Sequence, residues 1–250
     1  MSQLTNLNVA TLASAARHAD AQDVLWGDYL MNAGSKAATL DKLAQLRRAA
    51  IAIVLFGPAE DPHVIFTRRS AKLKAHAGQV SFPGGRREED DQHLLQTALR
   101  ECGEEISLEL STSHLLAQLP PSASGSGYLI QPYLFHVADL SLGSLRAQES
   151  EVDEIFSVRC QDFAGTLTAE IGHFTIDGRP RYWYKYATEP SPLWGVSAAI
   201  WSQLLMAANV PHLASPDQTE ASSLADIDIG LDDVKADRRR ALEQTQGILG

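Results

Sequence analysis

The chain has 250 residues, of which 44% are hydrophobic and 21% are charged, so it is long and apolar enough to bury the core of a globular protein. Its formal net charge of -10 argues against nucleic acid or an anionic membrane as a partner, because both are held mainly by Lys and Arg. Two cysteines, Cys102 and Cys160, are too few for a disulfide framework and fit a reducing compartment. Since the first residues also lack the pattern of a secretory signal, we expect a cytoplasmic protein.

The first part of the chain changes from a weak helical pattern to a strong strand pattern. Residues 1–38 contain few apolar anchors, and we interpret them as an N-terminal extension. Leucines at helical spacing behind a threonine cap predict a helix over Thr39–Arg48. The apolar segment Ala49–Phe56 predicts a buried strand, and the turn formers at 57–62 followed by His63–Thr67 predict a hairpin.

The second half of the chain predicts more strands and another helix. Four further segments have the composition of strands: Gln79–Phe82, Leu115–Leu119, Tyr128–Val137 and Arg181–Ala187. Residues 120–127 are rich in Pro, Ser and Gly, and they fit either a lid or a plain connection. Trp194–Ala208 predicts a helix, and from Ser215 the chain is polar and acidic. We therefore expect one domain over 39–214 and a tail over 215–250 that is mobile or a short helix.

A predicted helix that begins at residue 91 or 92 and ends near 107 carries three carboxylates on one narrow face. Glu101 and Glu105 are one turn apart, and Glu104 lies beside them. Like charges at this spacing repel by roughly 0.2–0.5 kcal/mol per pair, so we expect a cation among them. The alternative is a solvated acidic face, the usual fate of a run of charges. An adjoining apolar stripe predicts that the helix packs on a core: Leu95, Ala98, Leu99, Cys102 and Ile106.

Two glycines and a group of basic residues precede this helix. Gly84 and Gly85 would let the backbone approach a metal ion or a phosphate closely, although a tight turn would also explain them. Basic residues gather on both sides of the glycine pair: Arg68, Arg69, Lys72, Lys74, Arg86 and Arg87. In an otherwise acidic chain they are a candidate phosphate-binding patch. Scattered solvated bases are the alternative, because the acidic run at 88–90 would neutralise part of the charge.

The segment Gly85–Leu108 resembles the signature of the Nudix hydrolases, a glycine and an acidic residue followed by Arg-Glu-aliphatic-x-Glu-Glu-x-Gly-aliphatic. The loop before Arg100 is one residue longer than the general pattern, which is similar to the coenzyme A diphosphatase subgroup, where Asp91 would match the loop acid. Ser107 stands in place of the second glycine. We expect it to cost little, provided that the helix ends in an ordinary turn.

Motifs outside this signature also resemble the coenzyme A diphosphatase subgroup. Upstream, residues 65–85 are similar to its additional motif, but Lys74 stands where the subgroup has arginine, so the charge is kept and a bidentate phosphate contact is lost. The resemblance covers about Arg47 to Leu205. Its downstream motifs are Leu119-Pro120-Pro121, Ser126-Gly127-Tyr128, Val152-Asp153-Glu154-Ile155-Phe156 and Leu193-Trp194-Gly195.

The resemblance implies an α/β (α+β) fold, the Nudix-type α/β/α sandwich with a mixed β-sheet between helices. Oxygen ligands without a His or Cys cluster favour Mg²⁺ or Mn²⁺ over zinc. Glu101 and Glu105 are the first candidates for ligands, with Glu104 as a further ligand or water-orienting residue and Gly85 as a backbone neighbour of the metal. Arg100 would hold a carboxylate in place. The candidate substrate-binding residues are Arg68, Arg69, Lys74, Gly84 and Gly85.

The implied reaction is hydrolysis of the diphosphate linkage of coenzyme A or acyl-coenzyme A to 4′-phosphopantetheine, or its acyl form, and adenosine 3′,5′-bisphosphate. One alternative is another nucleoside diphosphate derivative, such as ADP-ribose, a nucleotide sugar or a dinucleotide. A second is a non-catalytic binding or regulatory module. A homodimer is left open. Trp194, Tyr128 and Tyr182 are candidates for stacking on adenine, with core packing as the competing role for each.

Overall fold

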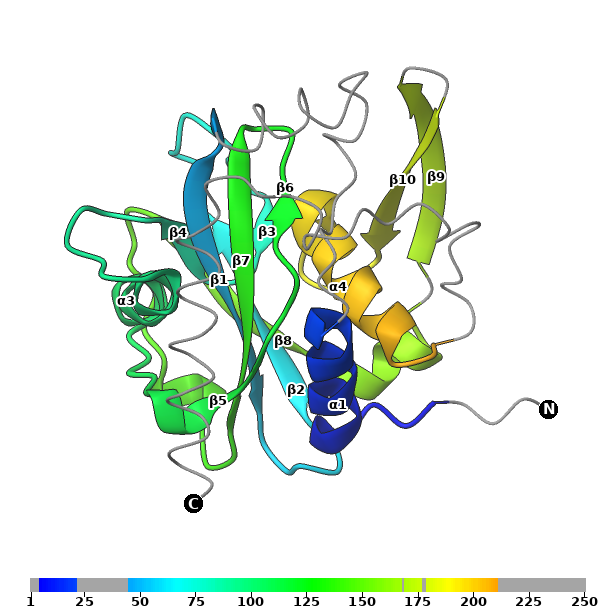
Figure 1. Cartoon of the computed structure of the whole chain (residues 1–250). Helices are drawn as coiled ribbons and strands as arrows, with labels where there is room; N and C mark the ends of the chain where they lie inside the picture. The colour runs from blue at the N-terminus through cyan, green and yellow to red at the C-terminus, as the bar shows by residue number, and fades with distance from the viewer. Residues whose placement is uncertain (1–4, 22–44, 168, 177–178, 211–250) are drawn as a thin grey trace.

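The computed structural model describes residues 5–21, 45–167, 169–176 and 179–210, and the tail predicted over 215–250 lies outside these ranges (Figure 1). No helix within the described ranges is long and apolar enough to cross a membrane.

The central sheet is built around β1 (Arg47–Phe56), which pairs parallel with β7 (Tyr128–Val137) and antiparallel with β2 (His63–Arg69). The predicted hairpin of β1 and β2 is confirmed, with Phe56 opposite His63. Shorter or outer strands complete this sheet: β3 (Val80–Ser81), β4 (Gly84–Arg86), β5 (Leu115–Gln118), β6 (Ser122–Ala123) and β8 (Val152–Arg159). Because both parallel and antiparallel pairs occur, the prediction of a mixed sheet is confirmed.

A second, antiparallel sheet consists of β9 (Ala169–Ile176), β10 (Arg179–Tyr186) and β11 (Leu193–Trp194). β10 begins two residues before the predicted strand, whereas β8 and β9 were not expected as strands. Each of these two strands contains polar or glycine residues that weaken its local strand pattern. Pairing with β2 and β10 supplies the backbone partners that local composition does not reveal.

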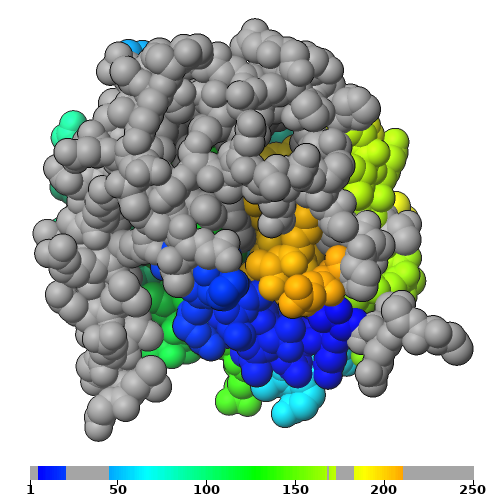
Figure 2. Space-filling model, turned by 45° about the vertical axis from the view of Figure 1, so that its right-hand side comes forward, coloured from blue at the N-terminus to red at the C-terminus, as the bar shows by residue number. Residues whose placement is uncertain are grey.

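Helices cover both faces of the central sheet (Figure 1). α3 (Leu94–Ile106) packs on the face that carries Ala50, Ala52 and Val54 of β1. α1 (Val9–Ala21) and α4 (Gly195–Ala207) contact each other and belong to the core on the other face, and Figure 2 shows them side by side. Since alternate residues of β1 enter the two cores, the α/β/α arrangement follows from the strand period of two. Short 3₁₀ helices occupy Thr112–His114, Leu142–Ser144 and Cys160–Ala164.

Two local predictions need correction. The helix predicted over Thr39–Arg48 cannot extend to its expected end, because β1 begins at Arg47; residues 39–44 lie outside the described part. The loop predicted over 120–127 includes strand β6, whose Ser122 and Ala123 are buried opposite residues of β7. The backbone of β7 needs hydrogen-bond partners along both edges, so this segment is partly a strand.

Candidate active site

The carboxylate helix α3 begins two to three residues later than expected and ends in an unusual backbone conformation. His93 caps its start by accepting a hydrogen bond from the Gln96 amide. At its end, Ser107 has φ 54° and ψ 37°, in the left-handed region. The condition under which Ser107 would cost little, an ordinary turn at the helix end, is therefore not met. The reversal lets the amide of Leu108 bond to the carbonyl of Cys102, which ends the helix in a position that favours glycine.

The three predicted carboxylates differ in burial. Glu105 and Glu101 are buried, at 2% and 8% exposure, whereas the side chain of Glu104 is 57% exposed. Burial raises the pKa of Glu105 to about 8, although the amide of Gly84 donates to its Oε2 at 3.1 Å. Burial also raises the pKa of Glu101, and the neighbouring Arg100 partly opposes this shift. Two carboxylates therefore face inward in surroundings that disfavour their charge unless a cation is near.

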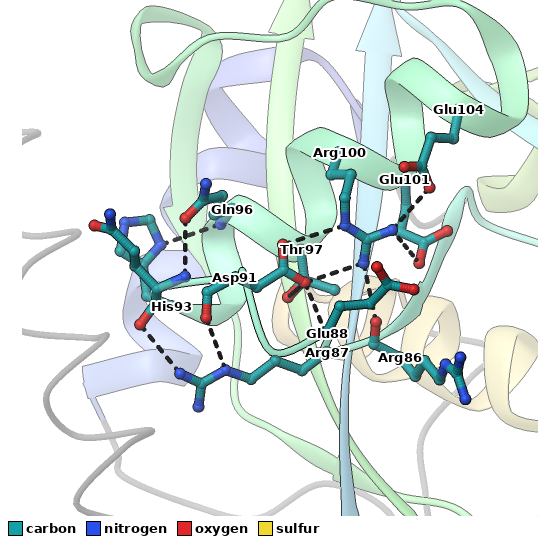
Figure 3. A network of polar contacts seen from close by, with 11 residues as sticks. Arg86, Arg87, Glu88, Asp91, His93, Gln96, Thr97, Arg100, Glu101 and Glu104 are labelled. Carbon is teal, nitrogen blue, oxygen red and sulfur yellow. Dashed lines mark hydrogen bonds and ion pairs between the residues drawn. The ribbon is translucent and has the colours of Figure 1, made fainter.

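Arg100 is a cation among these acids, and it connects the helix to the preceding loop (Figure 3). Its guanidinium forms two hydrogen bonds with Asp91, at 3.2 and 3.0 Å. Its Nη1 also donates to Glu101 at 3.0 Å and to Glu104 at 2.7 Å, and its Nη2 donates to the Arg86 carbonyl. This network holds the loop acid and the helix in one arrangement, as a forked guanidinium does well.

Asp91 connects this loop to α3 through hydrogen bonds. Burial raises its pKa, but hydrogen bonds from Arg100, the Glu88 amide and the Thr97 hydroxyl outweigh that effect and leave the pKa below its usual value. The position that the resemblance matched to the loop acid thus acts here by positioning Arg100.

The glycine pair is required by close packing rather than by a turn alone. β4 pairs with β1, which places Gly84 opposite Ile51 and Gly85 opposite Ala50. A Cβ atom on Gly84, where φ is 153°, would overlap the backbone of β1. A Cβ atom on Gly85 would overlap the carboxylate of Glu101. The absence of side chains at both positions lets the sheet and the carboxylate helix approach each other.

Arg68 and Arg69 lie on opposite faces of the central sheet. Arg69 reaches Glu105 under α3, with 3.5 Å between Nη1 and Oε1. Arg68 forms an ion pair with Glu154 of β8 at 3.0 Å, and Glu154 lies on the same strand face as Phe156, which is buried in the opposite core. Within the described part of the chain, the Nε of Arg68 is buried without a hydrogen-bond partner. Strand alternation therefore divides the basic patch that the sequence presents as one group.

Lys74 is exposed in the connection between β2 and β3, and no ion pair joins it to a carboxylate within the described residues. The neighbouring His76 has φ 56°, and its Nδ1 lies 2.9 Å from Oε1 of Gln79. The structure brings Arg69, Arg100 and the glycine pair to the buried carboxylates, whereas Lys74 forms no ion pair with them.

Glu151 is an acidic residue of this site that the sequence interpretation missed. It directly precedes β8, and its carbonyl accepts a hydrogen bond from Ser70 at the end of β2. Nearby, the amide of Gln148 donates to the carbonyl of Glu105. The charge of Glu151 contributes to the raised pKa of both Glu101 and Glu105. Only the pairing of β2 with β8 brings Glu151 to the helix, so no local sequence motif indicates its role in the site.

The donor atoms of the site are suited to a hard divalent cation. Glu101 and Glu105 offer carboxylate oxygens in buried positions where a positive charge would offset the cost of their ionisation. Oxygen donors of this kind fit Mg²⁺ or Mn²⁺. In the described ranges no three His, Cys, Asp or Glu side chains are already gathered closely enough to form a metal-binding group. The residues fit the ion chemically, and the ligand set itself stays a prediction.

Comparison with known proteins identifies the family of this chain. The NUDIX domain family matches residues 46–177. A relative named mitochondrial coenzyme A diphosphatase NUDT8, from Mus musculus, is 35% identical over 157 residues, which cover 62% of this chain and 74% of that protein. An uncharacterized Nudix hydrolase NudL from Photorhabdus laumondii is 35% identical over 150 residues, covering 60% and 79%. The chain therefore belongs to the NUDIX domain family.

The expectations of a Nudix hydrolase, an enzyme acting on phosphorus-containing acid anhydrides, and of a resemblance to the coenzyme A diphosphatase subgroup are confirmed. Members of this family generally use divalent metals such as Mg²⁺ or Mn²⁺ and act on small nucleoside diphosphate compounds. Among solved structures, a MutT/nudix family protein from Enterococcus faecalis is 16% identical with a TM-score of 0.42, covering 71% of this chain and 70% of that one.

Proposed function

We propose that this protein hydrolyses the diphosphate linkage of coenzyme A or acyl-coenzyme A with Mg²⁺ or Mn²⁺, giving 4′-phosphopantetheine, or its acyl form, and adenosine 3′,5′-bisphosphate. The observation that carries the proposal is the pair of buried carboxylates, Glu101 and Glu105, against the glycine pair of β4. The substrate is suggested by the relative named coenzyme A diphosphatase, at 35% identity. The small-molecule substrate, a cytoplasmic location and a homodimer are parts of the same hypothesis.

In this proposal Glu101 and Glu105 hold the cation, with Glu104 as a third ligand or as the residue that orients water, and the backbone of Gly85 lies beside the ion. When bound, the cation would neutralise phosphate oxygens and lower the pKa of a bound water. Arg100 keeps Glu101 and Glu104 in place through its bonds to Asp91. Glu104 and Glu151 are the candidates for accepting a proton from water, because both lie beside the buried pair.

The remaining candidate residues would contact the substrate. Arg69 is already beside Glu105, so a phosphate bound there would meet both a guanidinium and the metal. Gly84 and Gly85 let β4 pack closely against β1 and the Glu101 carboxylate, so their backbone would lie beside a phosphate bound to the metal. Arg68 is paired with Glu154 on the other face of the sheet and Lys74 is exposed, so in this proposal both would act on parts of the substrate further from the diphosphate.

A screen of diphosphate compounds with product identification tests this function. Purified protein with Mg²⁺ or Mn²⁺ is incubated separately with coenzyme A, acetyl-coenzyme A, ADP-ribose, a nucleotide sugar and a dinucleotide. Release of adenosine 3′,5′-bisphosphate from the first two is expected, and Glu105→Gln should lower the rate at least a hundredfold. Turnover of ADP-ribose, a nucleotide sugar or a dinucleotide without coenzyme A would select the first alternative. Binding without any turnover would select the non-catalytic module.

A further inference from the structure

An exposed aromatic face lies on the second sheet, outside the carboxylate site. Trp183 of β10 and Trp194 of β11 are 36% and 48% exposed. Lys185 lies opposite Trp194 and two residues beyond Trp183, so the three side chains share one face of the sheet. The alternate residues Tyr184 and Tyr186 are buried in the core on the other face. The competing role of Trp194 in core packing is therefore excluded.

On the outer face, the Trp183 ring lies over a glycine of the neighbouring strand. Gly172 of β9 lies opposite Trp183, and a Cβ atom at that position would overlap the indole. The Trp183 ring is thus laid against the backbone of its neighbouring strand. Lys185 is near both indoles, and its Nζ contacts Glu170 at 3.3 Å. Flat indoles beside an ammonium group match a flat aromatic base that is attached to a negatively charged phosphate.

The position of this face suits one part of a diphosphate substrate. β11 lies against β3, at one end of the central sheet. From Ser81, the last residue of β3, the chain reaches Gly84 in three steps, roughly 10 Å if extended. In a nucleoside diphosphate the base is separated from the diphosphate by one ribose, which is a span of the same order. A base can therefore reach toward β11 while the diphosphate lies at the glycine pair.

A second copy of the chain fits this face less well. A fully buried aromatic side chain contributes about 150–250 Å², so two partly exposed indoles supply well below the roughly 800 Å² per partner that a stable interface needs. A single stacked base needs only one ring face, and stacking on an aromatic side chain is worth enough to change binding about tenfold or more.

We propose that the face formed by Trp183, Lys185 and Trp194 binds the purine ring of a phosphorylated nucleoside, with Trp194 as the stacking residue. This inference deepens the proposed function and rests on it for the identity of the substrate. It assigns the nucleoside end of the substrate to the second sheet, whereas the metal and the diphosphate belong to α3 and β4.

Calorimetric titration of metal-free protein with adenosine 3′,5′-bisphosphate tests the inference without any hydrolysis. Trp194→Ala should weaken binding about tenfold, and Trp194→Phe should restore it to within about threefold because a ring remains. The Trp194 side chain forms no capping hydrogen bond with α4, so its replacement leaves the helix start intact. Ile171→Ala is the matched control, since Ile171 is 41% exposed on the same sheet but lies opposite Tyr184. Trp183→Ala gives the same test at a second position.

The outcomes separate this inference from the proposed function. If coenzyme A is hydrolysed, Trp194→Ala should raise KM about tenfold and leave kcat within about twofold. Hydrolysis by the wild-type chain, together with unchanged nucleotide binding by Trp194→Ala, overturns the inference alone. Tryptophan-dependent nucleotide binding without turnover of any diphosphate supports the inference and overturns the proposed function. A shift from dimer to monomer in Trp194→Ala, measured by sedimentation, would assign the face to a second copy and also overturn the inference.

Discussion

Ser107 is the residue at which the chain departs from the usual signature, and it does not adopt the ordinary turn in which it would cost little. Its left-handed backbone conformation costs a residue with a side chain roughly 1–2 kcal/mol, which glycine avoids. Ser107→Gly should therefore raise the free energy of unfolding by about 1 kcal/mol, measured by denaturant titration. Ser111→Gly is the control, because Ser111 has an extended backbone at φ -129°. An equal gain from both substitutions would contradict the conformational explanation.

The buried carboxylate of Glu105 predicts how stability depends on pH in the absence of metal. Its pKa rises from 4.5 to about 8 on folding, mainly because of burial. Between these values the unfolded chain has lost the proton and the folded chain retains it, so the contribution of Glu105 to stability should be fully present below pH 4.5 and be lost as the pH rises through about 8. Thermal unfolding of metal-free protein across this pH range measures the slope of stability against pH. Glu105→Gln should flatten it, whereas Glu104→Gln at the exposed neighbour should leave it unchanged.

At the scale of elements, strand β2 separates two arginines that are adjacent in sequence. Arg69→Ala removes the cation beside Glu105 and should lower kcat/KM at least tenfold on any substrate that the protein hydrolyses. Arg68→Ala removes a side chain from the other face and should leave kcat within about threefold, with any effect confined to KM. Steady-state kinetics of the two variants provides matched controls. Equal losses in kcat would contradict the placement of the two arginines on opposite faces of the sheet.

Some helices and strands can be predicted from the sequence pattern alone. β7 and α4 follow long apolar patterns, and their predicted bounds agree with the structure within one residue. Arg100, which we expected to hold a carboxylate in place, contacts Glu101 and Glu104 on its own helix. By contrast, β6 lies in a segment rich in Pro, Ser and Gly, and only its pairing with β7 makes it a strand. Glu151 likewise has no local signal, because its role depends on the pairing of β8 with β2.

At the scale of the whole molecule, the described part of the N-terminal segment contributes to the core. Leu12 of α1 is fully buried against the same cluster as α4. Leu12→Ala should lower the free energy of unfolding by about 2–5 kcal/mol. Because α1 lies on the face of the sheet away from α3, kcat of the folded variant should be unchanged.

Denaturant titration and steady-state kinetics measure these two effects separately. Ser14→Ala is the control on the same helix, because Ser14 is exposed and its replacement should change the free energy of unfolding by no more than about 0.5 kcal/mol. A large loss of kcat in Leu12→Ala at low temperature, where the variant is folded, would contradict the separation of α1 from the carboxylate site.

The sequence by itself determined the carboxylate helix and the glycine pair before it, because each depends on residues close together in the chain. The family, and with it the class of reaction, followed from the same local motifs. Tertiary structure alone decided which acids are buried and that Arg68 and Arg69 face opposite ways. It also decided that Glu151 lies near the buried carboxylates and that Trp183 and Trp194 share one exposed face. These features depend on which strands pair and which face each helix covers. Pairing is a long-range outcome of burying apolar surface and satisfying the backbone, so no short segment encodes it.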